Sequence, residues 1–173
     1  PAHYVFKNHL PLTPDISRMD AVVSELRVQK GGDSPEAQYE ALIEMVGNRG
    51  AIGFRSGVRS FVVVVTDAAP HVAGDWPPNP SLAGRAGPLS VQFSGKPEDG
   101  VADGNPLDED YPSAQQVMSA LRSADITPIF LVSGRSLPIY EAFVRSFGRG
   151  VSMPISSDSS DLIEVLFSGL QKA

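Results

Sequence analysis

The sequence contains no cysteine, which excludes disulfide bonds and thiolate metal sites. It also lacks a long hydrophobic run: the longest apolar stretch, Phe61 to Val65, is far shorter than the ~20 residues that a membrane-spanning helix needs. The N-terminus carries no signal-peptide pattern. No glycine-rich phosphate loop, nucleophile elbow or kinase signature is present, so these enzyme classes have no support.

The sequence also lacks a cluster of basic residues. The 14 basic residues are scattered along the chain, so nucleic acid is not an expected partner. The 20 acidic residues outnumber them, and a mildly acidic surface suits divalent cations or basic partners. A length of 173 residues with 42% hydrophobic residues is typical of one globular domain.

The hydrophobic pattern alternates between short apolar runs and segments of helical spacing. We predict strands over 4–12, 61–65, 128–132 and 151–155. We predict helices that begin after Thr13-Pro14, at Ser34-Pro35-Glu36 and at Ser113, and further helices over 137–147 and 158–170. This order indicates an α/β fold of the doubly wound type, with a mostly parallel sheet and helices on both faces.

The stretch from 69 to 112 shows no periodicity and is rich in Pro, Gly, Asp and Asn. Such a long irregular segment is unusual inside a compact domain. It is interpreted either as a functional loop or as a disordered insertion, and the sequence does not decide between the two.

Polar residues follow the predicted strands where ligands bind in open α/β sheets. Asp67 follows the strand 61–65, and Ser133 and Ser157 lie just after the next two strands. Asp67 is the strongest candidate, because a carboxylate at the end of a hydrophobic strand is a good ligand for a hard cation. The alternative is that Asp67 caps a helix or a loop.

Two further groupings have competing interpretations. Asp33 and Glu36 flank Ser34, and their spacing alone favours a capping box at a helix start over a pair of metal ligands. The four-residue spacing of Asp67, His71 and Asp75 is that of a helical metal stripe, although Pro70 and Gly74 interrupt a helix there.

Several segments, in the same order along the chain, resemble the I-like domain of integrin β subunits, which is of the von Willebrand factor A type. The resemblance covers nearly the whole chain, and its order makes it specific. The matching segments are Phe6 to Thr13, Gly32-Asp33-Ser34-Pro35-Glu36, Tyr39-Glu40-Ala41-Leu42, Ile52-Gly53-Phe54-Arg55, Val64-Val65-Thr66-Asp67-Ala68, His71-Val72-Ala73-Gly74-Asp75, Leu82-Ala83-Gly84, Asp110-Tyr111-Pro112-Ser113, Pro128 to Val132 and Ser156-Ser157-Asp158-Ser159-Ser160.

The resemblance implies a set of metal ligands. Glu36 would be a direct ligand of a central adhesion-site cation, Mg²⁺ or Mn²⁺, and Asp67 would serve this site and an adjacent one. Asp33, Pro35 and Glu36 would hold a neighbouring cation, and Ser157 would give its carbonyl to the adjacent site in the closed domain. Ca²⁺ is the second cation that the resemblance implies.

The chain also departs from the family pattern. The family's Asp-x-Ser-x-Ser loop, with the first strand and first helix, has no counterpart in residues 1–173, and Gly31 stands where the family has asparagine. We therefore expect an incomplete I-like domain with an unpaired sheet edge. The missing N-terminal segment is expected as a separate chain, a disordered segment or part of another piece of the protein.

The expected function is divalent-cation-dependent adhesion or protein binding at the cell surface or outside the cell. The ligand would be a protein that carries an Asp or Glu, and an integrin α-like subunit is a further expected partner. The expected class is not an enzyme. The alternative is a metal-dependent hydrolase that uses Asp67, His71 and Asp75.

Overall fold

The structure is a computed structural model that describes residues 6–27, 35–72 and 112–173. At its centre is a parallel three-stranded sheet in the order β1 (Ser60–Thr66), β2 (Ile126–Val132), β3 (Val151–Pro154). Ser60 pairs with Ile126 at one end of the first ladder and Thr66 with Val132 at the other. Every residue of the central strand β2 is buried. The strands predicted over 61–65, 128–132 and 151–155 are thus confirmed within a residue or two.

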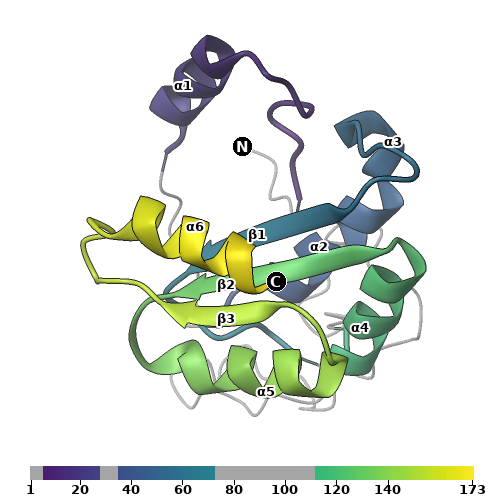
Figure 1. Cartoon of the computed structure of the whole chain (residues 1–173), viewed down its shortest axis with the longest axis vertical. Coiled ribbons are helices and arrows are strands. Elements are labelled where there is room, and N and C mark those ends of the chain that lie inside the picture. Colours follow the sequence, from purple (N-terminus) through teal and green to yellow (C-terminus); the bar gives the residue numbers. More distant parts are fainter. Residues whose placement is uncertain (1–5, 28–34, 73–111) are drawn as a thin grey trace, which may run out of the picture.

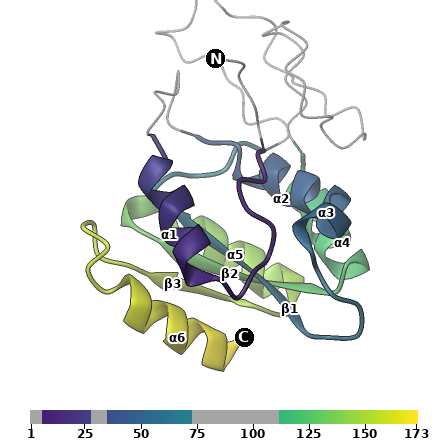
Figure 2. The same ribbon diagram turned by 90° about the horizontal axis from the view of Figure 1, so that it is seen from above.

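Helices cover both faces of the sheet, as predicted (Figure 2). On one face lie α2 (Gln38–Gly47), α4 (Ala114–Ser123) and α5 (Leu137–Phe147). Their apolar side chains form the larger core with Phe130 and Val132 of β2. On the other face α6 (Leu162–Lys172) packs over Ile129, Leu131 and β3 in a smaller core. The doubly wound α/β class is therefore correct, with a partial sheet.

Local signals account for several element boundaries. The helix predicted to begin at Ser113 is confirmed, because Ser113 caps α4 and forms a capping box with Gln116. Asp15 caps α1 (Ile16–Glu25) by accepting from the backbone N–H groups of Ser17 and Arg18. A left-handed glycine, Gly148 with φ of 80°, ends α5. The short helices α3 (Arg49–Ile52) and η2 (Gly134–Ser136) complete the described elements.

Three predicted elements differ from the structure. Residues 6–12, the described part of the predicted strand 4–12, form no strand, and Leu12 N–H instead donates to the Ile52 carbonyl. The second helix begins at Gln38, not at Ser34-Pro35-Glu36, because the Glu36 backbone is engaged in a β-bridge with Pro70. The last helix begins at Leu162, because residues 157–161 form turns before it.

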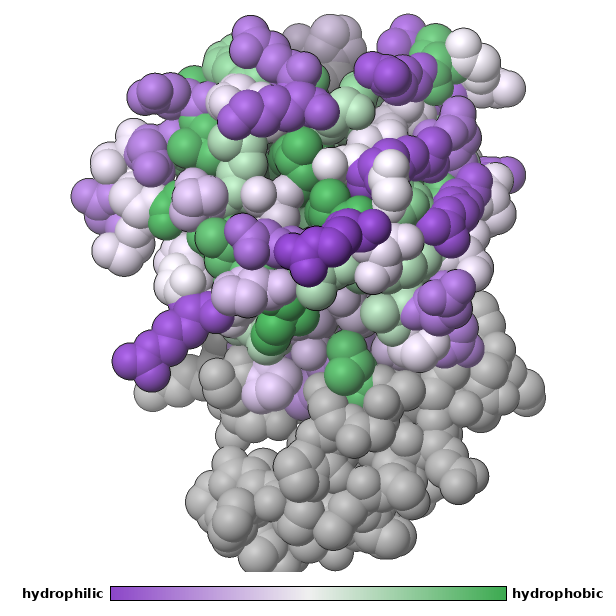
Figure 3. Space-filling model, turned by 60° about the horizontal axis from the view of Figure 1, so that its bottom comes forward, coloured by the Kyte–Doolittle hydropathy of each residue, from purple (hydrophilic) through white to green (hydrophobic). Residues whose placement is uncertain are grey.

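The continuous apolar run of β1 is typical of a strand covered on both faces of a parallel sheet, but the structure covers only one of them: the face of β1 on the side of α6 is partly exposed. Val63 and Val65 are 39% and 51% exposed, because β1 is an edge strand and α6 lies over β2 and β3. Helix α1 lies beyond the open edge of β1, and none of its residues is buried (Figures 1 and 2). Figure 3 shows the molecule with the bottom of Figure 1 turned forward. On this side of the surface, hydrophilic residues are mixed with scattered hydrophobic ones.

The described ranges contain no helix that is both long and apolar enough to cross a membrane.

Candidate functional site

The carboxyl ends of β1, β2 and β3 meet at one edge of the sheet. The backbone N–H of Ser133 donates to the Thr66 carbonyl at 2.9 Å, and that of Ile155 donates to the Val132 carbonyl at 3.1 Å. Consequently the segments that follow the three strands, which begin near Asp67, Ser133 and Ser156, lie in order along this edge. This is the edge where open α/β sheets bind ligands.

A fourth segment joins this edge through Glu36. The Glu36 N–H donates to the Ala69 carbonyl at 2.9 Å, and the His71 N–H donates to the Glu36 carbonyl at 2.9 Å. These bonds form a short parallel bridge between Glu36 and Pro70. The Glu36 backbone therefore lies beside the segment that follows Asp67, and both carboxylate residues are exposed to solvent.

Hydrogen bonds between side chains and backbone fix the turn that carries Asp67. Thr66 Oγ1 accepts from the Ala68 N–H at 3.1 Å and from Nε2 of Gln38 at 2.7 Å. On the other side, the Tyr140 hydroxyl donates to the Ala68 carbonyl at 3.0 Å. Asp67 is thus held between two anchored neighbours, one bonded to the start of α2 and the other to α5.

Tyr140 is well placed to anchor this turn. Its side chain is fully buried, and its ring lies 4.8 Å from the Phe130 ring on β2. Burial raises the pKa of Tyr140 above its ordinary value of about 10. The hydroxyl therefore stays protonated at physiological pH and remains a donor to the Ala68 carbonyl.

The turn after β3 has its own network. Asp161 accepts from the Ser156 hydroxyl at 2.7 Å and from the Ser156 N–H at 2.9 Å. These bonds lower the pKa of the Asp161 carboxyl, the hydroxyl contribution being the larger. Asp158 accepts from the Ser160 N–H at 3.1 Å, and this bond lowers the Asp158 pKa. Ser157 lies between these bonded residues and is exposed.

The remaining predicted site residues fall into two groups. Asp33 and Asp75 lie outside the described residues, and Pro35 is half-buried beside Glu36. His71 is 6% exposed, whereas Asp67 is exposed, and residues 67–72 do not form a helix. The structure therefore does not provide the helical stripe proposed for Asp67 and His71.

The donor chemistry of this edge suits a hard cation, but the described residues supply an incomplete set. Glu36 and Asp67 offer carboxylate oxygens, and the Oε1 atom of Gln38 is buried with no hydrogen-bond partner among the described residues. In the parts 6–27, 35–72 and 112–173, no three His, Asp or Glu side chains converge into a metal-binding group. A complete coordination shell needs donors from elsewhere.

The residues that position this site were not among the candidates predicted from the sequence. Gln38, Thr66 and Tyr140 come from α2, β1 and α5, and no spacing rule connects them. The one usable signal is Thr66, since a hydroxyl residue that ends an apolar strand is placed to bond the following turn.

Comparison with known proteins shows what the chain is similar to. The family model described as the integrin beta chain VWA domain matches residues 1–172. Integrin beta-PS of Drosophila melanogaster is 28% identical over 165 residues, 95% of this chain and 19% of that protein. Integrin beta-7 of Mus musculus is 30% identical over 166 residues, 94% of this chain and 19% of that protein. Integrin beta-7 of Homo sapiens is also 30% identical, over 170 residues. The chain therefore spans about a fifth of the length of these relatives.

Proposed function

Because this chain belongs to the integrin beta chain VWA domain family, we propose that it is part of a divalent-cation-dependent adhesion module. In this proposal, Glu36 and Asp67 are ligands of one cation, and an Asp or Glu of a protein partner is recognised there. The bridge between Glu36 and Pro70 carries the proposal, because it brings Glu36 beside the turn of Asp67. The expected cation is Mg²⁺ or Mn²⁺.

The chemistry of this edge follows from its incomplete donor set. A hard cation held by few protein carboxylates keeps an open coordination position that an outside carboxylate can fill. The residues of this chain orient that position: Tyr140 and Gln38 fix the turn of Asp67, and the bridge fixes the backbone of Glu36. The unpartnered Oε1 of Gln38 offers one further acceptor for a bound water.

Two further cations are proposed at the same edge, with Ca²⁺ the expected ion. Asp33 and the carbonyl of Pro35 would share Glu36 with a neighbouring cation. Ser157 would give its carbonyl to an adjacent site. Ser157 follows β3 and Asp67 follows β1, so β2 stands between them. Two strand spacings amount to about 10 Å, so we assign Ser157 to the adjacent site, which Asp67 would share, and not to the central site of Glu36.

The open edge of β1 offers a place where a further strand can pair, and we propose the missing N-terminal segment as the partner there. Thr66 directs its carbonyl to Ser133 beside β2, so the alternate residues Phe61, Val63 and Val65 direct their backbone groups to the open edge. The side chains of Val63 and Val65 are also exposed, on the sheet face that α6 covers over β2 and β3. A further strand with an apolar covering element would satisfy both. We assign this place to the missing N-terminal segment, supplied as a separate chain or from elsewhere in the protein.

The biological setting is also part of the proposal. Family membership favours a place at the cell surface or outside the cell, and pairing with an integrin α-like subunit. It favours a binding module over an enzyme. The alternative hydrolase of Asp67, His71 and Asp75 gains no support, because His71 is buried beneath the edge at which Asp67 is exposed.

Titration with Mn²⁺, followed by calorimetry, tests the central claim on this chain and on a longer protein that contains it. Glu36→Gln and Asp67→Asn should each weaken Mn²⁺ binding by more than about tenfold, since loss of even an outer-shell partner of a metal ligand typically costs about 10-fold to 100-fold, and both residues are proposed as direct ligands. Glu141→Gln, which alters an exposed carboxylate on α5, is the matched control and should bind as the parent does. Mn²⁺ binding that neither Glu36→Gln nor Asp67→Asn changes in the longer protein would falsify the proposal.

A further inference from the structure

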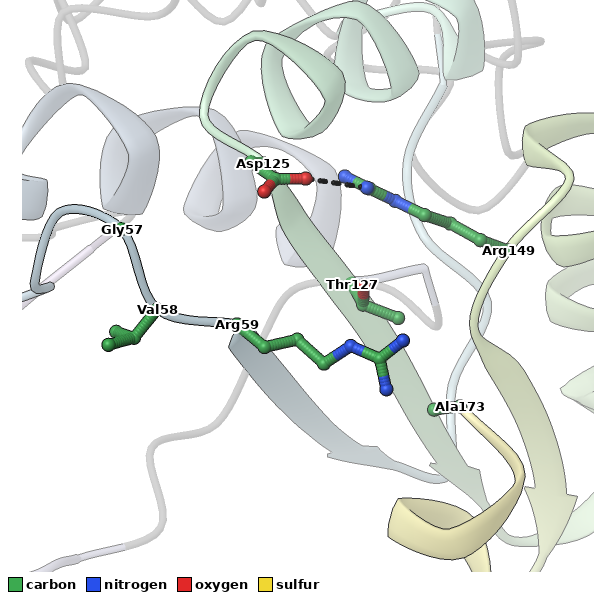
Figure 4. Close-up of a pocket in the computed structure, with 7 residues that line it drawn as sticks. All are labelled: Gly57, Val58, Arg59, Asp125, Thr127, Arg149 and Ala173. Carbon is green, nitrogen blue, oxygen red and sulfur yellow. Dashed lines mark hydrogen bonds and ion pairs between the residues drawn. The ribbon is translucent and has the colours of Figure 1, made fainter.

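A cavity of about 520 Å³ lies at the opposite end of the sheet, where the strands begin (Figure 4). The residues that line it are Gly57, Val58, Arg59, Asp125, Thr127, Arg149 and Ala173, the last residue of the printed sequence. The first six precede or open β1, β2 and β3, so this cavity and the candidate cation edge are at opposite ends of the strands. None of the predicted site residues takes part in it.

The side chain of Arg149, which lines the cavity, is held in place by its neighbours. Its Nη1 atom lies 2.7 Å from Oδ1 of Asp125, and its Nη2 atom donates to the Ile126 carbonyl at 3.1 Å. The guanidinium also lies 5.3 Å from the centre of the Phe147 ring. Asp125 therefore compensates the charge of Arg149, and three contacts hold the side chain in one orientation.

Arg59 is different, because it has no ion-pair partner among the described residues. Its guanidinium extends into the cavity from the start of β1 and lies 5.9 Å from the centre of the Phe61 ring (Figure 4). Two guanidinium groups against the single carboxylate of Asp125 leave one uncompensated positive charge among the lining side chains. The lining side chains can therefore bind a group that carries one negative charge.

The charge balance favours a carboxylate over a phosphate. A phosphate group brings about −1.5 to −2 charges at pH 7, which would meet the Asp125 carboxylate as well as Arg59. A single carboxylate matches the one spare charge and suits the planar fork of an arginine. Val58, which is 42% exposed at the rim, offers an apolar contact for the neighbours of such a group.

We propose that this cavity binds one Asp or Glu side chain of a protein segment, with Arg59 as the recognising cation and Arg149 as a positioning residue. The site is independent of the proposed cation edge, because it shares no residue with it. It gives the domain a second contact for an acidic protein segment, at the opposite end of its sheet.

The test is a ¹H–¹⁵N NMR titration of the ¹⁵N-labelled chain, prepared with a C-terminal amide so that no terminal carboxylate of Ala173 competes. Three probes are compared: a blocked Leu-Glu-Leu tripeptide, the matching Leu-Gln-Leu tripeptide and inorganic phosphate. The glutamate peptide should shift the amides of Gly57, Val58 and Thr127 and the side-chain N–H of Arg59 in a saturable way. The glutamine peptide should leave them unchanged, and phosphate should bind more weakly than the glutamate peptide.

Variants assign the effect to the cavity. Arg59→Gln should weaken binding of the glutamate peptide about fivefold, the upper range for one partly exposed ion pair. Arg59→Lys should retain part of the affinity, and Arg145→Gln, which alters an exposed arginine outside the cavity, should change nothing. The proposal is overturned by an unsaturable response, by equal responses to the two peptides, by tighter binding of phosphate, or by undiminished binding in Arg59→Gln.

Discussion

The backbone N–H of Glu36 donates to the carbonyl of Ala69 at 2.9 Å, which joins two segments far apart in the sequence at one edge of the sheet. Two residues further along, the side chain of Gln38 bonds Thr66, on the other side of Asp67. The segment 36–38 thus contacts the turn around Asp67 on both sides. A carboxylate on each segment is thereby placed at the edge where ligands of parallel sheets bind.

Tyr140→Phe removes one hydroxyl and keeps the ring that packs on Phe130. The Ala68 carbonyl loses its shorter hydrogen bond and keeps only the Thr66 hydroxyl at 3.4 Å, so we expect the free energy of unfolding to fall by about 1 kcal/mol. The amides of 66–71 should also exchange faster with deuterium, and Mn²⁺ affinity should fall. Ser146→Ala, which removes an exposed hydroxyl from the same helix, is the control. Unchanged exchange over 66–71 would show that this bond does not hold the turn.

Gly150→Ala should be strongly destabilising. Gly150 has φ of 90°, and a Cβ atom there would collide with the carbonyl oxygen of Pro128 on β2. The left-handed conformation alone costs about 1 to 3 kcal/mol for a residue with a side chain. We therefore expect a loss of at least about 2 kcal/mol in a denaturant titration. Gly148→Ala keeps a similar φ but meets no atom within 4 Å, so it should cost less. Equal losses for the two variants would contradict the collision.

The sequence was sufficient for features that depend on local chemistry. The apolar run from Pro128 to Val132 predicted a buried strand, and it is the fully buried centre of the sheet. Ser113 predicted a helix start, and its hydroxyl caps the backbone N–H of Gln116. Alternation of strands and helices then limited the fold to a few parallel arrangements.

Features that depend on distant contacts could not be predicted in this way. The motif around Ser34-Pro35-Glu36 predicted a helix start, but the bridge to Pro70 takes the Glu36 backbone out of the helix. The run of valines in β1 indicates two covered faces and says nothing about which segment covers the second. The pattern around Tyr140 is that of an ordinary amphipathic helix and gives no sign of a bond to Ala68. That bond can be recognised only once the positions of α5 and β1 are known.

The turn after β3 should depend on pH through Asp161. Hydrogen bonds from Ser156 hold the Asp161 pKa below its ordinary value of about 3.9. A carboxyl with a depressed folded pKa stabilises the fold at pH above the unfolded value, and this stabilisation is lost as pH falls through the folded pKa. We therefore expect the Ser156 amide resonance to shift below about pH 4 as its acceptor becomes protonated. Asp161→Asn should abolish the shift and Glu164→Gln should not; a shift that persists in Asp161→Asn would point to another group.

The open edge of β1 should make the isolated chain associate with itself. Val63 and Val65 are exposed beside backbone groups that have no strand partner within the described residues, and such an edge is a template for pairing with another chain. Val65→Lys places a charge on this edge, so light scattering and sedimentation should show less self-association. Ile139→Lys, which charges a similarly exposed apolar residue on α5, should have little effect. In the longer protein Val65→Lys should instead destabilise the fold, because the apolar element that covers the added strand would also bury the side chain at position 65. If Val65→Lys leaves the stability of the longer protein unchanged, the edge of β1 is not where the missing segment pairs.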